Sequence, residues 1–150
     1  VRLLRKLWTQ RLVAFEGDFD EVPDAGIYPL PVQQPIPIWF GGGSDATLKR
    51  MARLGDGWMP NSQTLEQLAS RLEHLRALIE DAGRDPAGFG LDVRIDMRRT
   101  GEDVWPEHLA RLRDLGATHV CLNTMGQDLD LDGHLDGLAR FRGVAAATLG

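Results

Sequence analysis

Three consecutive glycines, Gly41, Gly42 and Gly43, follow a short apolar run and lead into Ser44 and a basic, amphipathic segment. Glycine lets a ligand approach the backbone N–H groups closely, and a helix N-terminus carries a partial positive charge. Phosphate is the anion that best fits such a loop. The run is therefore a candidate phosphate site. The alternative is a tight strand-to-helix connection that binds nothing.

The elements that would position this loop alternate along the chain. Ser44 is a candidate helix N-cap, Gly55 a candidate helix end, and Thr64 with Gln67 forms a capping-box pattern. Helices are expected at residues 2–9, 45–54, from 65 to Gly83, from Pro106 to Gly116, and at 132–147, whereas 13–35 reads as an irregular insertion. Short apolar or alternating runs predict strands at 36–40, 56–59, 91–97 and 118–123.

This alternation predicts the α/β class, with four parallel strands in sequential order and the helices on one side of the sheet. A dinucleotide-binding domain is a weaker alternative. Gly41, Gly43 and Ala46 fit its glycine spacing. That fold also needs an acidic residue at the end of the second strand, and Asp56 stands at its start.

An acidic loop, Asp128-x-Asp130-x-Asp132, matches the first half of a calcium loop. The twelfth position carries Ala139 in place of the bidentate glutamate, so we interpret the segment as an acidic approach to a helix N-terminus.

His119 and Cys121 share one face of the fourth expected strand, and the sequence favours a buried thiol beside a hydrogen-bonded histidine over a nucleophilic pair. The remaining histidines lack metal-ligand spacing and are expected on the surface: His74, His108 and His134.

Composition narrows the function classes. The 150 residues suit one domain, and the net charge of −5 argues against nucleic-acid binding. The single cysteine rules out an intramolecular disulfide and suits a reducing, cytoplasmic compartment. No apolar run approaches the roughly 20 residues that span a bilayer. The chain opens VRLLRKLW inside a helical pattern and without methionine, so we expect it to be a fragment.

The stretch PVQQPIPIWFGGGSDATLKRMARLGDGWMP resembles the core segment of the bacterial-luciferase-like oxidoreductases, and is most similar to the subgroup that uses the deazaflavin F420. The resemblance extends through LWTQ and FEGDFDEV upstream and LRALIEDAGRDP downstream. It implies a (β/α)8 TIM barrel of roughly 250 residues or more, of which this chain would be the C-terminal half. It also implies F420 as cofactor, with FMN as the alternative.

By position, the resemblance places the cofactor's phosphate-bearing tail near two loops: Gly41, Gly42, Gly43 and Ser44, then Asn61 and Ser62. Some deazaflavin enzymes carry a lysine where Thr64 stands. The resemblance implies that the substrate-side and proton-handling residues lie mainly in the first four strands of the barrel, which this chain does not contain, so none of the residues of this chain is expected to be catalytic.

Two function classes follow from the sequence. The first is the cofactor-binding half of an F420- or FMN-dependent oxidoreductase of the monooxygenase class. Such a half would act with a small-molecule substrate, would be inactive alone, and would form homo-oligomers. The alternative is a non-catalytic half-barrel that binds a phosphorylated ligand or self-associates.

Overall fold

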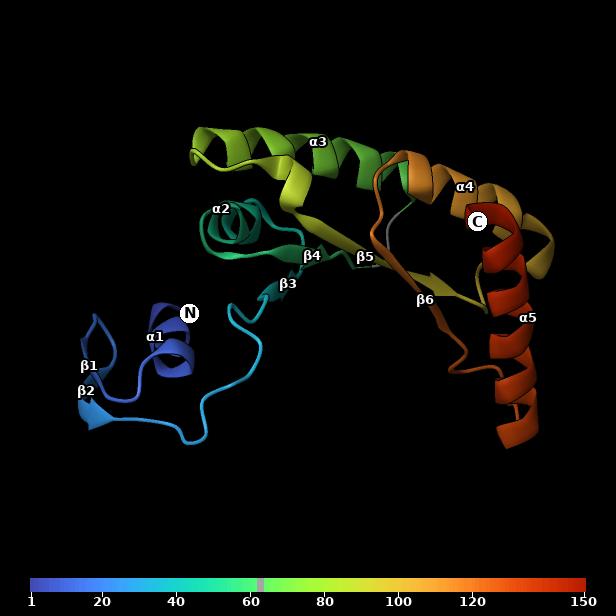
Figure 1. Ribbon diagram of the computed structural model, residues 1–150. Helices are drawn as coiled ribbons and strands as arrows, with labels where there is room; N and C mark the ends of the chain where they lie inside the picture. The colour runs from blue at the N-terminus through green and yellow to red at the C-terminus, as the bar shows by residue number, and fades with distance from the viewer. Residues whose placement is uncertain (62–63) are drawn as a thin grey trace. The chain divides into compact units, whose positions relative to one another are not determined.

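The computed structural model describes residues 1–61 and 64–150. The chain divides into two compact units, Val1–Ile38 and Trp39–Gly150 (Figure 1). Within the described residues, no helix has both the length and the apolar character needed to cross a membrane.

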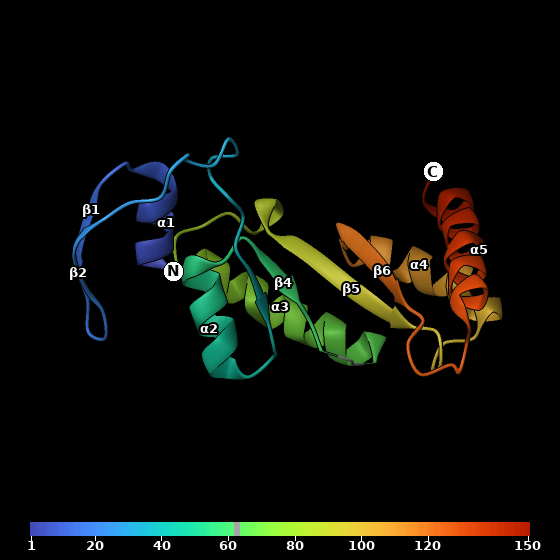
Figure 2. The same cartoon turned by 90° about the horizontal axis from the view of Figure 1, so that it is seen from below.

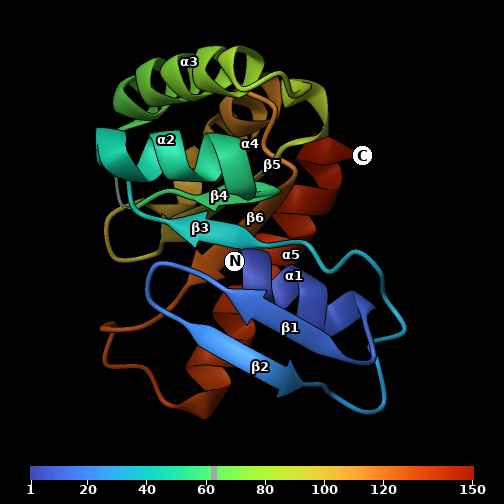
Figure 3. The same ribbon diagram turned by 90° about the vertical axis from the view of Figure 1, so that its left-hand side faces the viewer.

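The first unit contains the helix α1 (Arg2–Thr9) and a hairpin of two antiparallel strands, β1 (Val13–Glu16) and β2 (Glu21–Ala25) (Figure 3). The helix was expected, but the prediction of an irregular segment over residues 13–35 is wrong for these two strands. Phe15 pairs with Val22, and the amide of Gly17 donates to the carbonyl of Asp20 across the turn. The acidic residues between the apolar ones obscured this alternation.

The second unit is built on a parallel sheet of four strands in the order β3-β4-β5-β6. This order confirms the predicted sequential arrangement (Figure 2). The strands are β3 (Trp39–Gly41), β4 (Gly57–Met59), β5 (Gly90–Asp96) and β6 (His119–Asn123). The first strand begins three residues later than the predicted 36–40, because the alternating prolines at 35 and 37 supply no N–H for a ladder.

Helices follow the strands as the sequence predicts. They are α2 (Asp45–Leu54), α3 (Leu65–Asp81), α4 (Trp105–Asp114) and α5 (Leu131–Leu149), with short 3-10 turns η1 (Pro86–Gly88) and η2 (Glu102–Val104). Thr64 and Gln67 complete the capping box of α3, and Gly55 ends α2. The acidic loop leads into the N-terminus of α5, as expected, and there Asp130 accepts a hydrogen bond from the amide of Gly133.

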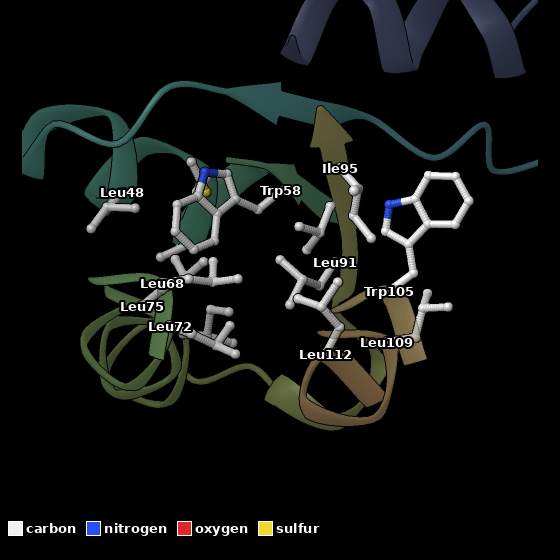
Figure 4. Close-up of a cluster of buried hydrophobic side chains, with 14 of the residues drawn as sticks. Leu48, Trp58, Leu68, Leu72, Leu75, Leu91, Ile95, Trp105, Leu109 and Leu112 are labelled. Carbon is white, nitrogen blue, oxygen red and sulfur yellow. The ribbon is translucent and has the colours of Figure 1, made fainter. Parts of the chain in front are cut away.

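The core lies between the sheet and the helices α2, α3 and α4, which cover one face of it (Figures 1 and 4). Leu91, Val93 and Ile95 of β5 are buried there. Arg94, between two of them, is exposed on the opposite face. The alternation along this strand therefore divides the sheet into a packed face and an open face, as period two requires.

On the open face, one aromatic ring, here called the plate, covers the amino ends of the strands. The indole of Trp39 lies across the neighbouring strands, and a Cβ added at Gly57 or Gly90 would overlap its ring atoms. The far edge of the indole meets His119 of β6 at 5.3 Å between ring centroids, in an edge-to-face arrangement with an interplanar angle of 89°. One side chain from β3 thus reaches all three other strands, and it can do so only because two of them carry glycine.

Candidate functional site

The glycine run lies where the sequence predicts it, at the carboxyl end of β3. Gly42 has a φ of 90°, a conformation that glycine adopts far more easily than other residues. Its carbonyl accepts a hydrogen bond from the indole Nε1 of the fully buried Trp58. Ser44 caps α2, because its Oγ accepts the amide of Thr47 at 3.3 Å. The loop is therefore held from the core side and ends at a capped helix N-terminus.

Asn61 follows β4 and meets this loop at the same edge of the sheet. Gly43, Ser44 and Asn61 line one open hollow of about 730 Å³. Gly41 lines a neighbouring cavity that also includes Asn61, and Gly42 lines neither. Ser62 lies outside the described residues. Four of the six predicted residues are thus brought to adjoining hollows around Asn61.

Arg71 of α3 completes the first hollow, and sequence reasoning missed it. Its Nη1 lies 2.8 Å from Oδ1 of Asp45, with both side chains substantially exposed at 44% and 70%. A pair this exposed holds its partners weakly, so the guanidinium is available to an incoming anion. Arg71 stands seven residues, or about two helical turns, after Thr64, and nothing in the sequence distinguishes it from the other charged residues of this helix.

Glu66 supplies a negative charge to the same hollow. Its own helix-start backbone hydrogen bond lowers the pKa of this carboxyl most, and hydrogen bonds from Arg111 and Thr64 lower the pKa further. Nη2 of Arg111 lies 2.9 Å from the carboxylate and compensates its charge. Glu66 therefore stays ionised at neutral pH without leaving the hollow strongly acidic.

A second cavity of about 530 Å³ opens on the exposed face of the sheet, around Arg94, Cys121 and Asn123. The sequence prediction of a buried thiol is wrong, because Cys121 is exposed on this face, opposite Arg94 in the β5–β6 register. The histidine part of that prediction is confirmed, since Nδ1 of His119 lies 2.9 Å from Oγ1 of Thr118. Oδ1 of Asp92 is buried in this cavity without a hydrogen-bond partner among the described residues.

A third hollow, of about 350 Å³, lies at the end of β5 and includes His108 of α4. The expectation of a surface residue is wrong for His108, which is half-buried; burial, and secondly the positive charge of Arg111, lower the pKa of its imidazole. It is wrong for His134 as well, which is half-buried with its Nδ1 2.8 Å from Oγ1 of Thr124. His74 is exposed as predicted.

Comparison with known proteins places this chain in a family. The sequence profile of the luciferase-like monooxygenases matches residues 1–146. The chain belongs to the luciferase-like monooxygenase family.

Two curated relatives illustrate the similarity to this family. An uncharacterized protein of Mycobacterium tuberculosis is 33% identical over 135 residues, which cover 87% of this chain and 44% of that protein. An F420-dependent glucose-6-phosphate dehydrogenase of Kineococcus radiotolerans is 37% identical over 99 residues, 65% of this chain and 29% of that protein. The chain thus spans less than half the length of these luciferase-like relatives.

Solved structures agree on the fold. An F420-dependent secondary alcohol dehydrogenase in complex with an F420-acetone adduct matches with a TM-score of 0.57 at 16% identity, over 95% of this chain and 51% of that one. A riboflavin lyase with modified FMN matches with a TM-score of 0.56 at 15% identity, over 76% and 33%. This luciferase-like chain is accordingly a partial TIM barrel of four parallel strand–helix units, as its sequence predicts.

Proposed function

We propose that this chain binds the phosphate-bearing part of an F420 cofactor within an oxidoreductase of the luciferase-like family. The observation that carries the proposal is the glycine loop at the N-terminus of α2, whose Gly43 and Ser44 line one hollow together with Asn61 and Arg71. The residues present fit a phosphate group. Gly43 adds no side chain to the approach, and a helix N-terminus favours an anion.

Arg71 can supply the positive charge that some deazaflavin enzymes obtain from a lysine at the position of Thr64. The guanidinium supplies a cation to the same hollow from two turns further along α3. It also presents several N–H donors to phosphate oxygens in a planar fork. In the proposed complex, Arg71 exchanges its exposed partner Asp45 for the ligand.

The choice of F420 over FMN rests on relatives. A curated relative at 37% identity is named as F420-dependent, whereas a fold neighbour at 15% identity holds a modified FMN. F420 would supply hydride transfer at its deazaflavin ring. The residues of this chain would bind and orient its tail, while the proton-handling groups and most substrate-side groups are expected on strands beyond these four. The chain alone is therefore expected to be inactive and to self-associate through its open sheet.

Replacing Gly42 by alanine is expected to weaken F420 binding about tenfold, because an L-residue at this φ costs roughly 1–2 kcal/mol and shifts the loop. Fluorescence titration of F420 measures the effect. The matched control is Gly83→Ala: Gly83 also has a positive φ, 72°, and its added Cβ meets no atom within 4 Å. Equal F420 affinities for the two variants would contradict a role of the glycine loop in binding.

Replacing Arg71 by glutamine is expected to raise the Kd for F420 by about tenfold, since a charge-assisted hydrogen bond is lost. Asp45→Asn is expected to act in the opposite direction and tighten binding, because it releases the guanidinium from its 2.8 Å pair. Titrations at two salt concentrations measure both effects, with Arg142→Gln on α5 as the control for a lost surface charge. The role of Arg71 fails if Arg71→Gln matches that control.

A further inference from the structure

The carboxyl end of β5 carries a cluster of polar groups that the cofactor tail does not account for. Two hollows meet there, the 350 Å³ one beside His108 and the 530 Å³ one on the open face. Both are lined by Asn61, Arg94, Asp96 and Arg99. Because active sites of TIM barrels form at the carboxyl ends of the strands, this position is one where a substrate would be held.

Arg94 is the distinctive group of this cluster. Its side chain is exposed on the open face, and no other described residue accepts a hydrogen bond from its guanidinium or forms an ion pair with it. Asp96, two residues further along the strand, is committed to the turn that follows: its Oδ1 accepts the amide of Arg98 at 3.0 Å. A guanidinium that faces a cavity without a partner is a ready donor to a carboxylate or a phosphate.

The same cavity contains the buried Oδ1 of Asp92, which has no donor among the described residues. Buried polar atoms in folded proteins nearly always have a partner, and a carboxylate oxygen can only accept hydrogen bonds. This atom therefore marks a place for a hydrogen-bond donor, such as a hydroxyl group or water beside the anion, and not for the anion itself. The cavity is therefore suited to a polar ligand and is not a gap left by incomplete packing of the core.

We propose that the carboxyl end of β5 is a second anion subsite, in which Arg94 binds the carboxylate or phosphate group of the substrate. This inference rests on the proposed oxidoreductase function and adds the chemical class of its substrate, a small organic anion. The subsite adjoins the cofactor hollow, because the His108 hollow shares Asn61 and Gln67 with it, but Arg94 does not line the cofactor hollow. Asn61 would lie between the cofactor phosphate and the anionic group of the substrate.

His108 provides a reporter for this subsite that needs no enzymatic activity. The charged groups around its imidazole are Arg111 and Glu107 on α4, together with Arg94, Asp96 and Arg99, which line the same hollow. An anion bound at Arg94 would favour the imidazolium form and raise the pKa of His108. Sulfate is a suitable probe, because it is a tetrahedral dianion throughout the pH range in which histidine titrates.

The experiment is an NMR titration of the 150-residue chain with sodium sulfate, against sodium chloride at equal ionic strength. We expect sulfate to raise the pKa of His108 and to shift the amide of Gly43 independently. Arg94→Gln should weaken the sulfate response of His108 about tenfold, and Arg94→Lys should restore part of it. Arg71→Gln should weaken only the Gly43 response.

The outcomes separate the two proposals. If sulfate leaves the pKa of His108 unchanged, or if Arg94→Gln responds like the unaltered chain, the second subsite is overturned while a Gly43 response still supports cofactor-phosphate binding. A His108 response without any Gly43 response would overturn the cofactor site and support the substrate subsite. The fold of each variant is checked by the dispersion of its amide spectrum before sulfate is added.

Discussion

Replacing Gly90 by valine is expected to lower the free energy of unfolding by about 3 kcal/mol, the upper end of the range for overpacking. A Cβ at Gly90 would overlap the six-membered ring of Trp39, with Cζ2 only 2.6 Å away. The indole cannot slide clear, because it already meets His119 and already lies against the backbone of Gly57. Urea unfolding followed by circular dichroism measures the loss.

Gly88→Val is the matched control for this prediction. Gly88 lies two residues earlier, and its added Cβ meets no atom within 4 Å. We expect this variant to remain close to the unaltered chain in stability. The double variant Trp39→Leu with Gly90→Val should recover part of the loss, since the smaller side chain leaves room for the methyl groups. If Gly90→Val and Gly88→Val unfold at the same urea concentration, Trp39 does not lie across the sheet as described.

Trp58→Ala is expected to lower the free energy of unfolding by about 3–5 kcal/mol, since Trp58 is completely buried and its removal leaves a large cavity. That loss is a large fraction of the roughly 5–15 kcal/mol by which domains of this size are stable. Trp58 packs among the side chains of α2 and α3 in the centre of the core (Figure 4). Urea unfolding measures this loss as well.

The milder variant Trp58→Phe tests how the core supports the site. Phenylalanine fills much of the space but cannot donate to the carbonyl of Gly42, so F420 binding should weaken. Trp105→Phe is a close control, because Trp105 is also fully buried and its Nε1 donates to a loop carbonyl, that of Thr100, at 3.2 Å. Equal F420 affinities for the two variants would show that the Gly42 hydrogen bond does not shape the site.

The sheet could be predicted from sequence because its signals are local. Apolar and charged residues alternate from Leu91 to Asp96, and this pattern shows which side chains face the core. Caps such as Ser44 and Thr64 lie directly beside the helices that they begin. The exposure of Cys121 could not be predicted in the same way. His119 and Cys121 visibly share a face, but β6 lacks the charged residues that mark the open face of β5. Only the β5–β6 register, with Arg94 opposite Cys121, decides which face that is.

The residues of the candidate site differ in the same way: the sequence predicts some of them and not others. The glycine loop is contiguous in sequence, so residue types alone point to it. Arg71 and His108 reach the hollows from helices that follow in the chain, and their relevance depends on how those helices pack on the sheet. A charged or titratable residue on an amphipathic helix is ordinarily a solvated one, and sequence offers no means of singling these two out.

The intrinsic fluorescence of Trp39, which forms the plate on the open face, can report on binding at that face. Of the four tryptophans, Trp58 and Trp105 are sealed in the core, and their emission should respond little to what happens at the surface. Trp39 is half-buried on the open face, so its emission is sensitive to what covers that face. Any partner or ligand that covers the plate should shift its emission to shorter wavelength, so that occupation of this face can be followed without a label.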